Sequence, residues 1–182
     1  MFGPILRGEH VTLRPPRTED LPRFVEWFAD LEVTRYLGRR SPPSLQEEEE
    51  WFKRMAEDKN NVMWIIEVDG KAVGGTGIHA IDWINAHGTT GIVIGEKSVW
   101  RRGVASETMA LRTAYAFREL NFHKLKTEVF AENEASRRAL EKSGYREIGV
   151  RHEERWSDGG WHDTWLAEVL REDWEREHRR GV

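Results

Sequence analysis

The stretch Gly91–Leu120, GIVIGEKSVWRRGVASETMALRTAYAFREL, decides how this chain is expected to fold. It opens with a short β-branched run, Ile92–Ile94, which is typical of a strand. The basic turn Trp100–Ala105 (WRRGVA) follows, and a long helical pattern begins directly behind it. The free N–H groups of a first helical turn and the helix dipole favour a bound anion. Strand, turn and helix in this order therefore predict a phosphate site.

Three residues of the turn suit a phosphate. Gly103 has no Cβ, so a phosphate can come close to the backbone. Arg101 and Arg102 add fixed charge and forked donors. A plain tight turn would explain Gly103 alone. The adjacent arginines, together with a second motif downstream, favour the anion site.

Composition limits the class of protein. The chain has 182 residues, 38% hydrophobic and 33% charged, so we expect one globular domain over residues 1–182. The net charge of −4 argues against general binding to nucleic acid. The chain has no cysteine, which excludes disulfides, thiolate metal sites and a cysteine nucleophile. With no apolar run of membrane length and no signal-peptide pattern, we expect a cytoplasmic enzyme.

The rest of the sequence alternates between strand and helix patterns. Strands are predicted at residues 10–14, 62–68, 71–79, 89–94, 124–130, 145–156 and 161–170. Helices are predicted from Thr18, over 31–37, from Ser44, over 104–120, from Asn133 to Gly144, and over 171–180. The strand at 124–130 should run parallel to the one at 89–94, because a helix crosses between them. We expect an α/β fold with a mixed sheet of about seven strands and helices on both faces.

Several local patterns have two interpretations. Gly74, Gly75 and Gly77 within one strand indicate either a bulge or a close approach of ligand or backbone. The acidic run Glu47–Glu50 suits a cation or polyamine site, but a solvated helix N-terminus capped by Ser44 is favoured. The helix at 104–120 is expected to bury Met109, Ala110, Ala114 and Phe117.

Two motifs carry a resemblance to a known family. Gly103 and Ala105 match the last two fixed positions of Q/R-x-x-G-x-G/A, the acetyl-CoA pyrophosphate loop of the GNAT N-acetyltransferases. Trp100 stands where that pattern has Gln or Arg. Asn133–Ser136 and Glu141–Tyr145 resemble the N-x-x-S…E-K-x-G-F/Y pattern of the RimJ/RimL branch, which acetylates protein N-termini. The resemblance extends more loosely from about Val11 to Trp174.

The resemblance implies a GNAT fold and acetyl-CoA as co-substrate, without a metal. It places the pantetheine arm along the strand that ends at Gly95, the pyrophosphate at the basic turn, and the thiol near the Asn and Ser of the second motif. The predicted acetyl-CoA residues are Val93, Ile94, Gly95, Arg101, Arg102, Gly103, Val104, Ala105, Ser106, Asn133 and Ser136.

The resemblance also suggests two catalytic residues. Many GNAT enzymes use a tyrosine as general acid where this chain has Leu140, so the role passes to Ser136. Glu128 matches a strand glutamate that acts as base through water in some N-terminal acetyltransferases. A surface carboxylate explains Glu128 equally well. Other candidates for the base are Asp82, His87, His152 and Glu154.

The predicted last hairpin carries His152, Glu154, His162 and Asp163. Together these could mimic a metal site. Without an H-E-x-x-H spacing or a cysteine, cross-strand polar pairing is favoured.

The resemblance implies acetyl transfer to a primary amine by direct attack in a ternary complex. The acceptor is a protein N-terminal amine or a small amine such as a polyamine or antibiotic. In this family the early helices and last strands form the acceptor cleft, to which Trp83, Trp156 and Trp161 could add aromatic surface for a cation. The alternatives are a non-catalytic CoA-binding regulatory module and a nucleic-acid-binding protein. The sequence leaves a monomer and a homodimer open.

Overall fold

The computed structural model describes residues 1–39 and 41–179. Over these residues eight strands form one mixed sheet in the order β1-β2-β3-β4-β5-β6-β8-β7. The strands are Leu6–Arg7 (β1), Thr12–Arg14 (β2), Val62–Val68 (β3), Lys71–Asp82 (β4), His87–Ile94 (β5), Lys124–Phe130 (β6), Arg146–Ser157 (β7) and Gly160–Leu170 (β8). Only β5 and β6 pair in parallel, as predicted from the helix between them.

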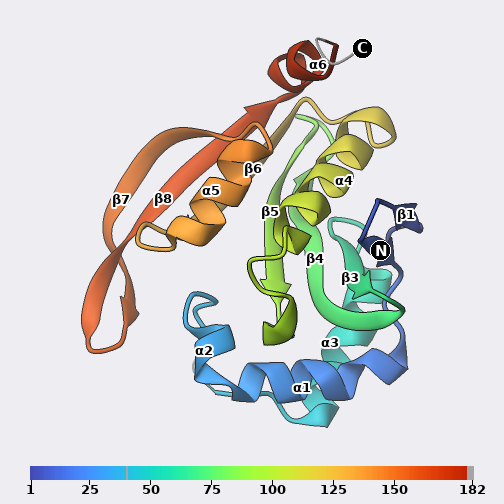
Figure 1. Ribbon diagram of the computed structural model, residues 1–182, viewed down its shortest axis with the longest axis vertical. Coiled ribbons are helices and arrows are strands. Elements are labelled where there is room, and N and C mark those ends of the chain that lie inside the picture. The colour runs from blue at the N-terminus through green and yellow to red at the C-terminus, as the bar shows by residue number, and fades with distance from the viewer. Residues whose placement is uncertain (40, 180–182) are drawn as a thin grey trace.

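Helices cover both faces of the sheet, as expected. They are α1 (Leu21–Ala29), α2 (Leu31–Thr34), α3 (Leu45–Glu57), α4 (Val104–Arg118), α5 (Glu134–Lys142) and α6 (Arg171–Arg179), with short 3-10 turns η1 (Thr18–Asp20) and η2 (Lys97–Val99). Figure 1 shows α4 and α5 over one face, with α1, α2 and α3 gathered at the other. Each face has its own core. Met109 and Phe117 of α4 pack with Trp64 and Leu125, whereas Phe24 of α1 belongs to the second cluster.

The start of the chain differs from the prediction. The extra strand β1 is only two residues long, too short to show an alternating pattern, and β2 begins at Thr12 rather than His10. The first helix is a 3-10 turn that leads into α1, and Arg17 rather than Thr18 precedes it. The cause is Asp20, whose carboxylate accepts the Arg17 N–H at 2.8 Å and two guanidinium bonds from Arg14. At the other end, the predicted last residue of α6, Arg180, lies outside the described residues.

The buried side of α4 also differs from the prediction. Met109 and Phe117 are buried, but Ala110 is exposed and Ala114 only half-buried. Arg112 is buried instead, and its Nη1 donates to the carbonyl of Gly91 at 2.8 Å. A search for apolar residues misses this side because α4 lies over a part of the sheet that offers polar backbone atoms.

That part is the divergence of β5 from β6. The two strands pair at only three positions, from His87↔Lys124 to Thr89↔Lys126. Beyond them β5 continues to Ile94 beside β4, while β6 continues to Phe130 beside β8. Backbone groups of β5 that face the gap therefore have no strand partner. This opening lies at the middle of the sheet, below the N-terminal half of α4 (Figure 1).

Candidate active site

The basic turn before α4 forms an open concave loop. Gly103 occupies the N-cap position with φ of 82°, and Arg101 also has a positive φ of 62°. A Cβ placed on Gly103 would meet no atom within 4 Å, so the glycine serves the backbone conformation and leaves the space in front of it open. No side chain caps this helix end. Its first N–H groups therefore remain available to an anion.

Side chains of the turn are arranged around this opening. Trp100, which stands where the family pattern has Gln or Arg, donates from Nε1 to the Ile94 carbonyl at 2.9 Å and ties the turn to the end of β5. Arg101 and Arg102 are exposed, and neither forms an ion pair within residues 1–39 and 41–179. Their charges are thus free to meet a phosphate.

The three donor-site residues predicted at the end of β5, Val93, Ile94 and Gly95, make different contacts. Val93 faces a pocket, described below, on the far side of the sheet from α4. The Ile94 carbonyl is already bonded to Trp100, and the Gly95 N–H donates to Val73 at 2.9 Å. A Cβ on Gly95 would overlap the Trp27 ring, so glycine is required there by packing.

The remaining predicted donor-site residues lie in the first turns of α4 and α5. Val104 is buried, while Ala105 and Ser106 are half-buried. Asn133 caps α5 by accepting the Ser136 N–H at 3.2 Å, and both side chains are half-buried.

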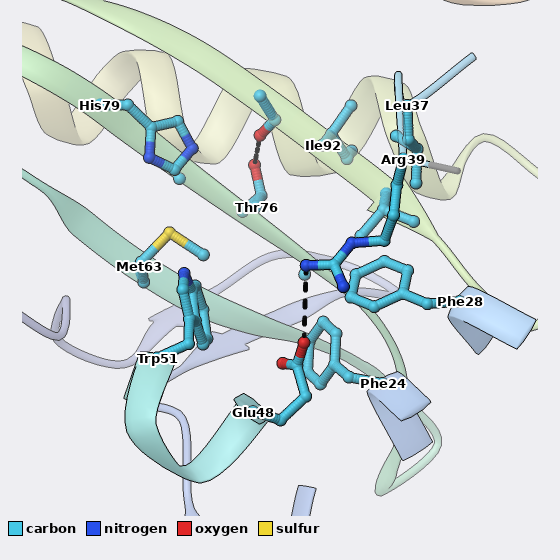
Figure 2. A pocket seen from close by; sticks show the side chains of 14 residues that line it. Phe24, Phe28, Leu37, Arg39, Glu48, Trp51, Met63, Thr76, His79 and Ile92 are labelled. Carbon is cyan, nitrogen blue, oxygen red and sulfur yellow. Dashed lines mark hydrogen bonds and ion pairs between the residues drawn. The ribbon is translucent and has the colours of Figure 1, made fainter. Parts of the chain in front are cut away.

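A pocket of about 260 Å³ lies on the α1–α3 face of the sheet (Figure 2). Strand alternation places Gly75, Gly77 and His79 of β4 on that face, and the pairing brings Gly91 and Val93 of β5 beside them. A Cβ on Gly77 would overlap Met63 Sδ, and one on Gly75 would lie 3.0 Å from the Phe24 ring. Of the two interpretations of these glycines, close approach holds at all three, because a Cβ on Gly74 would overlap the Val93 carbonyl oxygen. The bulge lies next to them, where Val73 is the extra residue.

Aromatic and charged side chains complete the pocket. They come from α1, the segment after α2, α3 and β3: Phe24, Phe28, Leu37, Arg39, Glu48, Trp51 and Met63. Figure 2 shows these side chains grouped around one hollow, with His79 on its wall. The mixture of apolar walls and a few polar groups is typical of a small-molecule site.

His79 was not singled out from the sequence. Its Nδ1 lies 3.1 Å from Asn61 Oδ1, and the Asn61 amide in turn donates to Asp58. Because that oxygen can only accept, Nδ1 carries the proton and Nε2 keeps a free lone pair. Burial, and next the positive charge of Arg112, lower the pKa of His79. The ring is therefore neutral at physiological pH. Its position two and four residues after Gly77 and Gly75 was the signal available in the sequence.

The predicted bases occupy other places. Glu128 lies on the same sheet face as the pocket, but it is exposed and accepts two bonds from Arg151, at 3.0 and 3.2 Å. This hydrogen-bonded pairing raises the pKa of Arg151. Asp82 accepts the N–H groups of Ile84 and Asn85 and so builds the turn before β5.

Of the polar residues on the β7–β8 hairpin, His152 and Asp163 pair across the strands, as predicted, whereas the ion-pair partners of His162 and Glu154 do not lie on the opposite strand. His152 Nδ1 lies 2.9 Å from Asp163 Oδ2, and His162 Nδ1 lies 2.6 Å from Glu132. Glu154 pairs with Arg151 at 3.3 Å. Within residues 1–39 and 41–179, no group of three or more His, Cys, Asp or Glu side chains could hold a metal ion.

The interpretation of Glu47–Glu50 as a solvated face is wrong for Glu48. The capping box is present, with Ser44 and Glu47 bonded to each other's backbone. Glu48, however, is only 3% exposed and lines the pocket. It shares the helical stripe of Trp51 and Met55, at positions i, i+3 and i+7, so the periodicity contained the signal. Leu45, one turn before Glu48 on the same helix, is 45% exposed.

Comparison with known proteins decides the family. The family model described as the acetyltransferase (GNAT) domain matches residues 10–146. This chain belongs to the GNAT family. It is 30% identical to the uncharacterized N-acetyltransferase YoaA of Bacillus subtilis, over 92% of this chain and 97% of that protein. It is 25% identical to Bacillus subtilis YdaF, whose name proposes a ribosomal N-acetyltransferase, over 93% of this chain and 96% of YdaF.

A solved structure agrees with the fold. Spermidine N-acetyltransferase from Vibrio cholerae, in complex with CoA and spermine, superposes with a TM-score of 0.86. It shares 22% identity, and the match covers 92% of this chain and 99% of that one. At this identity the likeness shows the fold alone. The GNAT enzyme described here uses acetyl-CoA as co-substrate and acetylates an amine. Among the described residues, no helix is long and apolar enough to span a membrane.

Proposed function

We propose that this GNAT enzyme acetylates the primary amine of a small acceptor bound in the pocket between α1, α3 and the β4–β5 floor. The observation that carries the proposal is the His79 ring in the wall of that pocket, whose Nδ1 lies 3.1 Å from Asn61 Oδ1. The pocket volume of about 260 Å³ favours a small acceptor. A protein N-terminal amine is the second candidate, supported by the likeness to YdaF.

The donor residues proposed here are those of the basic turn and the second motif. The open N-terminus of α4 at Gly103 and the charges of Arg101 and Arg102 would hold the pyrophosphate. Val104, Ala105 and Ser106 supply first-turn N–H groups. Beyond Thr89 the diverging strands leave β5 backbone groups for the pantetheine arm, although the Ile94 carbonyl and Gly95 N–H already have partners.

In the proposed reaction the amine attacks the thioester directly in a ternary complex. Acetyl-CoA supplies an activated acyl group, whose C–S bond breaks as the new C–N bond forms. His79 Nε2 takes the proton that the amine loses, and the Nδ1 bond to Asn61 holds the ring in the required tautomer. Ser136, or a water, protonates the leaving thiolate. Since a free thiol has a pKa of about 8.5, this step needs little help.

Glu128 remains the alternative base. Its two bonds from Arg151 favour a role in holding the β6–β7 surface instead. Replacing each residue separately decides between them. We expect His79→Gln to lower kcat by about 10²–10⁴-fold, the usual contribution of a general base, and Glu128→Gln to have little effect.

The experiment measures release of free CoA from acetyl-CoA over a panel of small primary amines and N-terminal peptides. His152→Gln is the matched control, because that exposed histidine also lies beside an acceptor oxygen, of Asp163. Full activity in His79→Gln would contradict the assignment of the base. Absence of CoA release with every amine would contradict the proposed function.

A further inference from the structure

Glu48 is a carboxylate in an unfavourable place. It is 3% exposed and sits among the aromatic side chains of Phe24 and Trp51 in the pocket. Burial raises its pKa, which Arg39 opposes and Glu47 reinforces. Glu48 is not needed to cap the helix, because its neighbour Glu47 already forms the capping box with Ser44. Burying its charge therefore costs free energy without a gain in capping.

One cation stands next to this carboxylate. Arg39 Nη2 lies 3.7 Å from Glu48 Oε1, beyond hydrogen-bond distance, and the Arg39 side chain is 38% exposed. The same guanidinium lies over the Phe28 ring, 4.7 Å from its centre. Figure 2 shows Arg39 reaching into the pocket between Phe28 and Glu48. A ring face and a carboxylate around one cation form a binding site that suits other cations of similar size.

The other charged groups near the pocket do not compete for this binding site. His79 is neutral, and Arg112 lies on the opposite face of the sheet, bonded to Thr76 and to the Gly91 carbonyl. The Glu47 carboxylate accepts the Ser44 N–H at 2.6 Å. Arg39 is therefore the cation beside Glu48 in the described part of the chain.

We propose that Glu48, with Phe28 and Trp51, binds a second positive charge on the acceptor, and that Arg39 fills this subsite while the acceptor is absent. The inference rests on the proposed function, because it places the acceptor in the same pocket. It defines the substrate class as an amine that carries another cationic group, such as a short alkyl diamine. Arg39 can be displaced by the acceptor, because its contact with Glu48 is longer than a hydrogen bond and its side chain is 38% exposed.

The first test compares acceptors of equal chain length, 1,4-diaminobutane and n-butylamine. For the wild type we expect a KM for the diamine that is lower by about tenfold or more, the usual effect of one charge-assisted contact. Glu48→Gln should remove this preference by raising the KM for the diamine toward the KM for n-butylamine. Glu49→Gln, an exposed neighbour on the same helix, is the matched control and should keep the preference.

Arg39→Gln gives the opposite expectation. Without the resident cation, the diamine should bind several-fold more tightly. An N-terminal dipeptide with lysine in second place, compared with one with norleucine, tells whether the second charge is read on a peptide as well. Equal KM values for diamine and monoamine in the wild type, or an unchanged preference in Glu48→Gln, would overturn the proposal.

Calorimetric titration of 1,4-diaminobutane into the CoA-bound protein separates this inference from the proposed function. Binding that Glu48→Gln abolishes, without turnover of any amine, would support the subsite and contradict the acetylation of small amines. Turnover of monoamine and diamine alike, with no Glu48 dependence, would leave the function and overturn the subsite. Thermal unfolding at pH 7 checks the fold of the variant. We expect Glu48→Gln to be at least as stable as wild type, since it removes a buried charge.

Discussion

At the scale of single residues, Arg112 is a buried charge that lowers the pKa of His79 in the pocket wall. It is 1% exposed, and within the described part of the chain no carboxylate pairs with it. Burial lowers its pKa, which Tyr145 opposes, and its Nη1 donates to Thr76 Oγ1 at 2.6 Å and to the Gly91 carbonyl at 2.8 Å. Thr76 and Gly91 also line the pocket, so the Arg112 guanidinium lies just across the sheet from it and lowers the pKa of His79.

Replacing Arg112 with methionine should raise the pKa of His79. The change removes the positive charge that, after burial, depresses this pKa. Gly91 keeps a donor, since Thr76 Oγ1 bonds the same carbonyl at 2.8 Å. If His79 must be neutral to act, the acid limb of kcat/KM moves to higher pH in the variant. NMR titration of the ring measures the pKa directly, with exposed His152 as the internal reference. An unchanged His79 pKa would contradict the proposed influence of Arg112.

The same pKa shift has a consequence for stability. The folded-state pKa of His79 lies below its ordinary value of 6.5, so the unfolded chain binds this proton more strongly. The contribution of His79 is therefore fully present above pH 6.5 and is lost as pH falls through the folded-state pKa. Glu48 has the opposite sign, because its raised pKa favours the fold at low pH and is costly at neutral pH.

Sequence reasoning failed most at the level of these residues. The local sequence pattern of the basic turn was enough to single out Gly103, Trp100, Arg101 and Arg102. His79 and Glu48 did not stand out in this way, because their roles depend on contacts with other segments: His79 of β4 with Asn61, and Glu48 of α3 with Arg39. For His79 the local sign was its spacing from Gly75 and Gly77. For Glu48 it was a charged residue on an otherwise apolar stripe, although charge runs are usually solvated.

At the scale of elements, α3 positions the acid wall of the pocket and depends on its first turn. Ser44 Oγ accepts the Glu47 N–H at 3.2 Å, and Glu47 Oε2 accepts the Ser44 N–H at 2.6 Å. Ser44→Ala should lower the free energy of unfolding by about 0.5–2 kcal/mol, the usual cost of losing a cap. Ser44→Asp, which keeps an acceptor, should retain most of it. Chemical denaturation measures both, and equal stability of Ala variant and wild type would contradict the capping role.

Element positions followed from the sequence wherever local signals set them. β3 was predicted at its observed bounds, because a glycine turn and an apolar run delimit it. The first helix was misjudged because the buried Arg14–Asp20 ion pair shapes its start. The buried side of α4 was misjudged because β5 and β6 diverge beneath it. The β5 carbonyls left without a strand partner accept hydrogen bonds from donors such as Arg112, so a polar side chain is buried there instead of an apolar one.

At the scale of the whole molecule, the sheet separates two regions. The basic turn opens at the N-terminus of α4, and the pocket lies on the face covered by α1 and α3. The basic turn and the pocket can be connected through the gap between β5 and β6 that opens after Thr89. The overall topology could be predicted because βαβ order fixes the parallel pair. One domain over residues 1–182, and the choice between monomer and homodimer, stay predictions.

This arrangement predicts that both substrates bind before the acetyl group is transferred. Because the chain contains no cysteine to carry an acyl group, the proposed reaction is direct transfer with both substrates bound together. Initial rates at several fixed amine concentrations should give intersecting lines in double-reciprocal plots against acetyl-CoA. Parallel lines, the sign of a covalent acyl-enzyme, would contradict direct transfer.

Calorimetric titration of acetyl-CoA into wild type, Gly103→Glu and Gly70→Glu asks whether the basic turn holds the donor. Both glycines are exposed and have positive φ, of 82° and 73°. A side chain added at either would find no atom within 4 Å of its Cβ, so the two variants share backbone strain and added charge. We predict tight binding to wild type and Gly70→Glu, and loss of binding in Gly103→Glu. Equal affinity in all three would place acetyl-CoA elsewhere and contradict the donor site.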